Sequence, residues 1–121
     1  MKLFKELIST NTNAPVILLF GGDPGRRHSV IQIISEIGDL TIYGALSETE
    51  GIQLLRERDK VDIVLIGGAY TSEQRVRIKN FIRDHDENIK ITEPGVEYRY
   101  SDEGIQKDIA KKLGLKTKIF N

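Results

Sequence analysis

Short apolar runs alternate with amphipathic stretches along the chain. The apolar runs cover residues 16–20, 40–46, 61–66 and 89–92, and two of them stop at a pair of glycines. Unbroken apolar runs of this length are typical of strands that are buried on both faces, as in parallel sheets. The segments between them carry apolar residues at helical spacing, over 27–37, 48–58, from 72 onward and over 102–113. The pattern therefore predicts four strands that alternate with four helices.

The two ends of the chain add one predicted element each. Leu3, Phe4, Leu7 and Ile8 fall on one side of a short helix predicted over residues 2–9. The polar stretch 9–15 ends in proline and predicts a linker. Residues 115–120 predict a fifth strand. We therefore expect a single domain, with an N-terminal helix and linker over 1–14 and a core over 15–121.

Strand–helix alternation of this kind predicts an α/β fold with a parallel sheet between two layers of helices. Right-handed crossovers place helices on both faces of such a sheet. The functional crevice of these folds lies beyond the carboxyl ends of the strands. Candidate functional residues are therefore expected in the loops 21–27, 46–49, 67–72 and 92–101.

Composition removes several classes of function. Eighteen basic residues balance eighteen acidic ones in 121 residues, which argues against a nucleic-acid-coating protein or a polybasic membrane protein. The chain has no cysteine and two histidines, so we expect no disulfide, thiolate metal site or cysteine nucleophile. No apolar run is long enough to span a bilayer. We expect a soluble, cytoplasmic domain that needs no cofactor and binds neither nucleic acid nor membrane.

Two strand ends carry a recognisable pattern. The first apolar run is followed by Gly21-Gly22-Asp23-Pro24, and the third reads Asp62-Ile-Val-Leu-Ile-Gly67. Both resemble the receiver domain of two-component response regulators, whose first strand ends in two acidic residues and whose third ends in the aspartate that accepts phosphate. The resemblance implies a flavodoxin-like, three-layer α/β/α sandwich with four or five parallel strands. Because the chain stops at Asn121, the last receiver helix would be missing.

The signature positions of the receiver site are altered. Gly21 and Gly22 stand at the acidic pair, beside Asp23, and Gly67 stands at the phosphate acceptor. Thr92 and Lys118 stand where receivers keep a Thr or Ser and a Lys. Glycine supplies no carboxylate for a phosphoryl group or for magnesium. The resemblance therefore implies a degenerate receiver with no catalytic residue and no metal site.

Our leading hypothesis is a non-enzymatic module for protein–protein interaction in signalling or regulation. The missing helix would leave apolar sheet surface open, and such patches mark interaction sites. The apolar residues Leu3, Phe4, Leu7 and Ile8 either fold back over that surface or meet a protein partner or a second copy of the chain.

The alternative hypothesis is a binder of a nucleotide or another phosphate-bearing small molecule at the loop 21–27. Helix N-termini attract anions, and the candidate ligand-binding residues are Gly22, Gly25, Arg26, Arg27 and Gly68. A plain tight turn with surface arginines explains the same loop.

The stretch after the fourth strand carries charge and aromatic residues. We interpret Glu93, Glu97, Asp102 and Glu103 as exposed loop charge, with Asp102 as a helix cap. Tyr98, Arg99 and Tyr100 suggest a stacking surface, an interface or a short edge strand.

Overall fold

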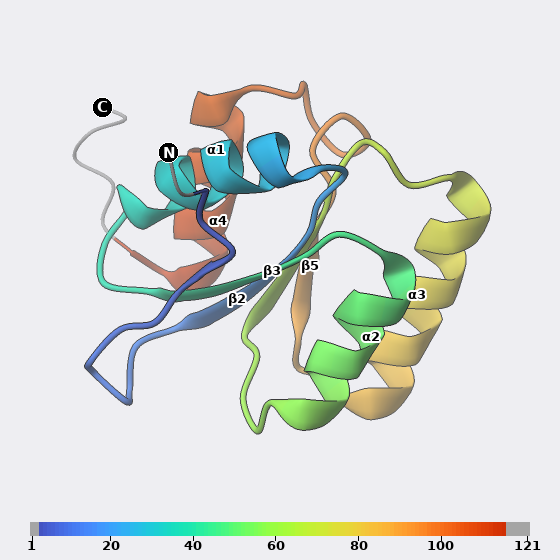
Figure 1. Cartoon of the computed structure of the whole chain (residues 1–121), viewed down its shortest axis with the longest axis horizontal. Coiled ribbons are helices and arrows are strands. Elements are labelled where there is room, and N and C mark those ends of the chain that lie inside the picture. The colour runs from blue at the N-terminus through green and yellow to red at the C-terminus, as the bar shows by residue number, and fades with distance from the viewer. Residues whose placement is uncertain (1–2, 116–121) are drawn as a thin grey trace.

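The computed structural model describes residues 3–115, which form one five-stranded sheet (Figure 1). The strand order is β1-β3-β2-β4-β5. Strands β2 to β5 are parallel to their neighbours, whereas β1 is antiparallel to β3. The bounds are Glu6–Leu7 for β1, Val16–Phe20 for β2, Thr41–Ala45 for β3, Ile63–Ile66 for β4 and Lys90–Thr92 for β5. The predicted α/β class and its four parallel strands are confirmed. Of the strand predicted over 115–120, only residue 115 lies within the described residues.

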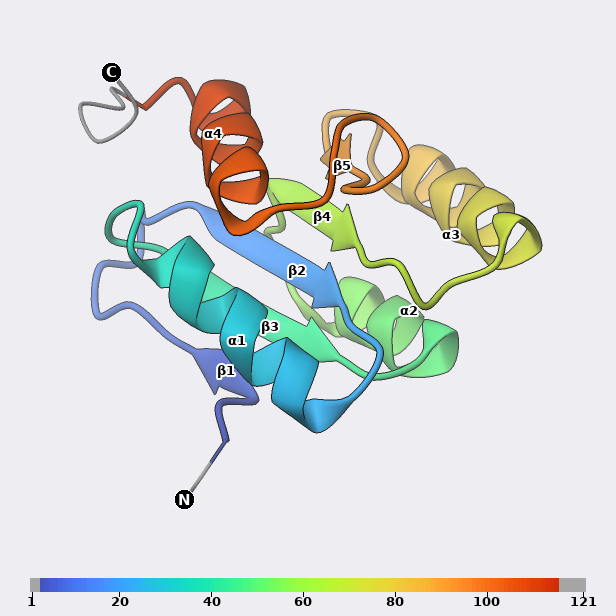
Figure 2. The same ribbon diagram turned by 90° about the horizontal axis from the view of Figure 1, so that it is seen from above.

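Helices lie on both faces of the sheet (Figure 2). Helices α1 and α4 pack on one face, over side chains such as Ile17, Leu19 and Ile63. Helices α2 and α3 pack on the other, over side chains such as Leu18 and Val64. Neighbouring strand residues therefore feed two separate apolar cores, as expected of strands buried on both faces. The helix bounds are Pro24–Ser35 for α1, Glu48–Glu57 for α2, Ser72–His85 for α3 and Asp102–Leu113 for α4.

Each helix begins after a polar residue whose side chain accepts a backbone N–H of the first turn. These caps are Asp23, Ser47, Thr71 and Ser101. The expectation that Asp102 caps the last helix was wrong by one residue, because Ser101 Oγ accepts the Gly104 N–H at 2.9 Å. No helix within residues 3–115 combines the length and the apolar character needed to cross a bilayer.

The helix predicted over residues 2–9 is wrong. Residues 6 and 7 instead form β1, which pairs Glu6 with Tyr43 and Leu7 with Ile42 at the edge of the sheet. A segment this short is a marginal helix on its own, whereas the edge of β3 offers unpaired backbone groups. Phe4 and Leu7 pack against the core on the α1 face.

Helix α4 packs beside α1 on the same face of the sheet. Ile105 and Ile109 of α4 belong to the same buried core as the α1 side chains. The Gln106 side chain also donates to the Ile33 carbonyl of α1 at 2.6 Å. The N-terminal segment does not fold back as a helix but pairs with β3, and Leu3 and Ile8 remain 37% and 61% exposed.

Candidate functional site

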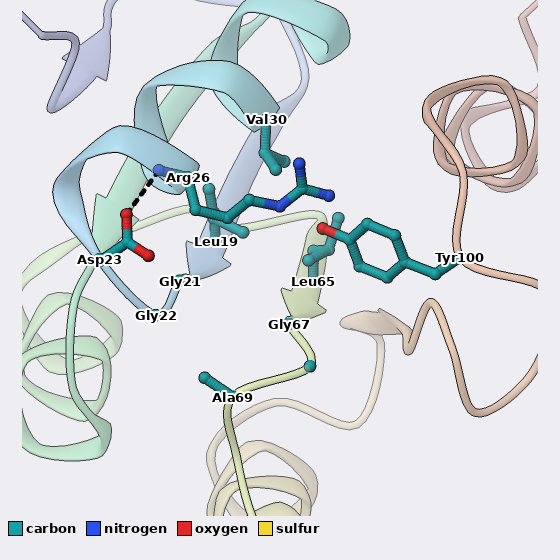
Figure 3. A pocket seen from close by; sticks show the side chains of 11 residues that line it. Leu19, Gly21, Gly22, Asp23, Arg26, Val30, Leu65, Gly67, Ala69 and Tyr100 are labelled. Atoms are coloured by element: carbon teal, nitrogen blue, oxygen red, sulfur yellow. Dashed lines mark hydrogen bonds between the residues drawn. The ribbon is translucent and has the colours of Figure 1, made fainter.

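A cavity of about 190 Å³ lies at the carboxyl ends of β2 and β4 (Figure 3). This place is the switch point of the sheet, because the chain leaves β2 for β3 on one side while β4 lies on the other. Open α/β sheets bind their ligands at such points. The cavity is lined by Leu19, Gly21, Gly22, Asp23, Arg26, Val30, Leu65, Gly67, Gly68, Ala69 and Tyr100.

The structure brings together most of the candidate residues of the first and third strand ends. Gly21, Gly22, Asp23 and Arg26 come from the end of β2 and the start of α1, and Gly67 and Gly68 follow β4. The other candidates lie elsewhere, since Gly25, Arg27 and Thr92 do not line the cavity. Lys118 lies outside the described residues.

The two glycine-bearing strand ends approach too closely for side chains. The Gly67 N–H donates to the Phe20 carbonyl at 2.9 Å. A Cβ atom at Gly67 would lie 2.9 Å from that carbonyl oxygen, and one at Gly22 would lie 2.9 Å from the Ala69 Cβ. Real Cβ atoms essentially never come this close to other heavy atoms, so a side chain at either position would force the neighbouring backbone or Ala69 to shift.

One cation and one anion face the cavity. The Arg26 guanidinium lies 4.6 Å from the centre of the Tyr100 ring, so α1 and the β5–α4 loop meet across the cavity (Figure 3). Asp23 lines the same cavity while its Oδ1 accepts the Arg26 N–H at 2.8 Å as the cap of α1. Leu19, Val30 and Leu65 make the remaining surface apolar. The site can therefore hold a small, mainly apolar group.

Tyr70 joins the two strand ends beneath the cavity. Its buried hydroxyl donates to the Gly21 carbonyl at 2.8 Å, and its ring meets Phe20 edge-on. Burial raises the pKa of Tyr70 to about 12, and the carboxylates of Glu50 and Glu48 act in the same direction. No spacing in the sequence indicated this contact, because the partner is a backbone carbonyl 49 residues away.

We predict that Tyr70 makes the stability of the fold decline at high pH. An unfolded chain loses the phenolic proton near pH 10, whereas the folded chain keeps it until the pKa of about 12. The contribution is therefore complete below pH 10 and is lost as the pH rises through about 12. Urea unfolding of Tyr70→Phe across this range should show a shallower decline than the parent chain. Parallel declines would contradict the assignment.

A buried ion-pair network lies behind the β4 end of the cavity. Glu93 is 6% exposed, and its carboxylate accepts from Arg75 Nη1 and Lys79 Nζ, each at 3.1 Å. The expectation of exposed charge at Glu93 was wrong, because these α3 cations compensate a carboxylate in the interior. Arg75 also donates to the carbonyls of Gly67 at 2.6 Å and Tyr70 at 3.2 Å. The network thus fixes the loop that carries Gly67.

Thr92 packs against the loop between β5 and α4. It is fully buried, and its hydroxyl shares a 2.6 Å hydrogen bond with that of Tyr98. Burial raises the pKa of Tyr98 to about 12, although the Thr92 hydrogen bond opposes the shift. The short strand suggested for this loop is reduced to a single bridge between Pro94 and Tyr98.

Within residues 3–115, no three His, Asp or Glu side chains are grouped so as to hold a metal ion. The site thus offers a small apolar cavity, a cation–π contact and a rigid backbone frame. No protein-family model, curated protein or solved structure matches this chain. The residues and their geometry alone support the function proposed below.

Proposed function

We propose that this chain is a receiver-like, non-enzymatic module that cannot be phosphorylated and that acts by binding a protein partner. The observation that carries the proposal is the close approach of the Gly67 backbone to the Phe20 carbonyl. Gly67 stands where receiver domains have the aspartate that accepts phosphate. A Cβ atom there would lie 2.9 Å from the Phe20 carbonyl oxygen. The aspartate is therefore absent from the sequence, and in addition the backbone leaves too little space for an aspartate side chain at this position.

The topology supports assignment to the flavodoxin-like, three-layer class. Numbered among themselves, the parallel strands β2 to β5 have the order 2-1-3-4. Flavodoxin-like folds have the order 2-1-3-4-5, so the described sheet corresponds to the first four strands. The antiparallel β1 is an addition beside β3. The two-sided helix packing agrees with this class.

The remaining signature positions support the loss of phosphoryl chemistry. Gly21 and Gly22 offer no carboxylate, and the Asp23 carboxylate caps α1. Thr92 is buried against Tyr98. Among the signature positions within residues 3–115, Asp23 alone carries a carboxylate, and its Oδ1 is engaged as the helix cap, so the set of carboxylates that holds an acyl phosphate and its magnesium ion is lacking there.

The cavity favours a protein partner over a phosphate-bearing molecule. Asp23 offsets the charge of Arg26 at the cavity, and Arg27 does not line it. The apolar surface of Leu19, Val30 and Leu65 suits one inserted aliphatic side chain, and about 190 Å³ accommodates a group of that size. A signalling or regulatory role in the cytoplasm, and self-association as one form of partnership, are parts of this proposal.

We predict that restoring the acceptor residue does not restore phosphorylation. The parent chain and Gly67→Asp are incubated with acetyl phosphate and magnesium, and intact masses are measured. Neither protein should gain the mass of a phosphoryl group, and Gly67→Asp should also unfold at a lower temperature because its Cβ meets the Phe20 carbonyl oxygen. A phosphoryl adduct on either protein would overturn the proposal. Gly68→Asp is the matched control, because a Cβ at Gly68 meets no atom within 4 Å.

A further inference from the structure

The N-terminal segment, residues 3–9, forms one edge of the sheet. Its strand β1 has two residues, pairs with β3 and stands at the end of the strand order. The Lys5 carbonyl accepts the Gly44 N–H of β3 at 3.1 Å. Further along, the Ser9 N–H donates to the Thr41 hydroxyl at 3.0 Å. The segment thus covers the edge of β3 through a short ladder.

His28 of α1 holds this segment through a nitrogen that must stay unprotonated. Its Nδ1 accepts the Phe4 backbone N–H at 2.8 Å, and the two rings stack with their centroids 4.9 Å apart. A neutral imidazole has one nitrogen that donates and one that accepts, whereas both nitrogens donate in the protonated ring. The contact therefore requires a neutral His28 ring with its proton on Nε2. A second proton would turn an N–H toward the Phe4 N–H and break the hydrogen bond.

The other histidine in the chain makes a similar stack without linking two elements. His85 lies 5.6 Å from Phe81, measured between ring centroids. Both residues belong to α3, and His85 is exposed at the end of that helix. The His28 stack instead joins α1 to a segment 24 residues away in the sequence. His85 is therefore a matched reference for the effect of protonating a stacked histidine.

The charged residues around His28 come from α1 and from the segment. The positions one helical turn before and after it hold no charged residue. Arg27 precedes it, while Arg26 turns to the cavity. The segment contributes Lys5 and Glu6, β3 contributes no charged residue, and α4 lies on the other flank of α1 (Figure 2). These neighbours carry no net negative charge that would favour a proton on the ring.

We propose that His28 is a pH-sensitive latch for the N-terminal segment. At neutral pH the unprotonated ring holds Phe4, and with it β1, against the sheet. Histidine takes up its second proton at about pH 6.5, and the protonated ring no longer accepts the Phe4 N–H. The released segment then leaves the edge of β3 open to pairing with another strand. Neither His28 nor Phe4 lines the switch-point cavity, so the latch does not depend on the proposed function.

Two amides of β3 report the release by hydrogen exchange. The Gly44 N–H donates to Lys5 in the segment, whereas the Thr41 N–H donates to Pro15 on the other side of β3. The Gly44 protection factor should fall about tenfold from about pH 7.5 to 5.5, because protonation at about pH 6.5 favours the released segment. The Thr41 protection factor should stay constant. An unchanged Gly44, or an equal fall at both amides from unfolding of the whole sheet, would overturn the inference.

Two asparagine variants separate the hydrogen bond from other effects of pH. His28→Asn places an acceptor oxygen near the position of Nδ1 and takes up no proton, so its Gly44 amide should be equally protected at both pH values. His85→Asn is the matched control and should keep the fall seen in the parent chain. A fall that persists in His28→Asn would contradict the latch. Nitrogen chemical shifts of the parent chain at neutral pH should place the His28 proton on Nε2, and a proton on Nδ1 would refute the contact itself.

Discussion

Replacing Arg75 by methionine is expected to lower the free energy of unfolding by about 3–5 kcal/mol, the usual cost of removing one partner of a buried ion pair. Arg75 and Glu93 are both more than nine-tenths buried, and their side chains meet at 3.1 Å. The substitution would leave the Glu93 carboxylate with Lys79 alone. It would also remove the donor to the Gly67 carbonyl. Urea unfolding followed by circular dichroism measures the loss.

The matched control is Arg77→Met, two residues further along α3. Arg77 also binds a carboxylate, with two hydrogen bonds to Glu48 at 2.8 and 2.9 Å, but it lies in solvent. Exposed ion pairs contribute little, so this variant should unfold close to the parent chain. The double variant Arg75→Met, Glu93→Leu should recover part of the lost stability, because it removes the buried carboxylate and the cation that then loses its partner, Lys79, is one-third exposed. Equal losses for Arg75→Met and Arg77→Met would refute the network.

Gly51→Ala is expected to destabilise the fold by about 1–3 kcal/mol, as overpacked cores do, although alanine is the better helix former. Gly51 is buried in the middle of α2. A Cβ atom there would overlap Cε2 and Cζ of the Phe20 ring. Because Phe20 is fully buried in the core between β2 and α2, the ring has little room to move. The loss is measured by urea unfolding.

Gly25→Ala provides the control for that substitution. Gly25 is also helical, and a Cβ there would make ordinary contact at 3.4 Å with Asp23 Oδ1. Ala at this position should leave stability unchanged or raise it by up to about 1 kcal/mol. Phe20→Leu replaces the ring by a smaller side chain. In that background, Gly51→Ala should lower the free energy of unfolding by less than it does in the parent chain. An unchanged cost in both backgrounds would show that the ring is not the cause.

The elements that sequence reasoning predicted well are those with a long apolar pattern. The runs that became β2 and β4 are buried on both faces, so no competing structure could accommodate them. The N-terminal segment was predicted wrongly because the spacing of Leu3, Phe4, Leu7 and Ile8 suits a helix in isolation. Its strand conformation depends on the free edge of β3, which only the folded sheet provides.

The candidate site could be predicted in part for a similar reason. Parallel strands bring their carboxyl ends together, so the sequence alone predicts that Gly21, Gly22 and Gly67 are neighbours. Arg75 and Tyr70 could not be found in this way. Both donate hydrogen bonds to backbone carbonyls. Because every residue has a backbone carbonyl, the sequence gives no signal for such a partner. Adjacent Arg26 and Arg27 are equivalent in the sequence, but in the structure Arg26 lines the cavity and the stem of Arg27 lies over Gly44.

An amide NMR titration of the parent chain with magnesium and beryllofluoride, followed by isobutanol, tests the central claim most directly. Beryllofluoride with magnesium mimics an acyl phosphate, and isobutanol mimics an aliphatic side chain. The account predicts no saturable shift with the first probe and shifts at Gly21, Gly22 and Gly67 with the second. Those shifts should vanish in Gly68→Leu, which has room for its side chain beside the cavity. Saturable shifts at the same glycines with beryllofluoride would contradict the account.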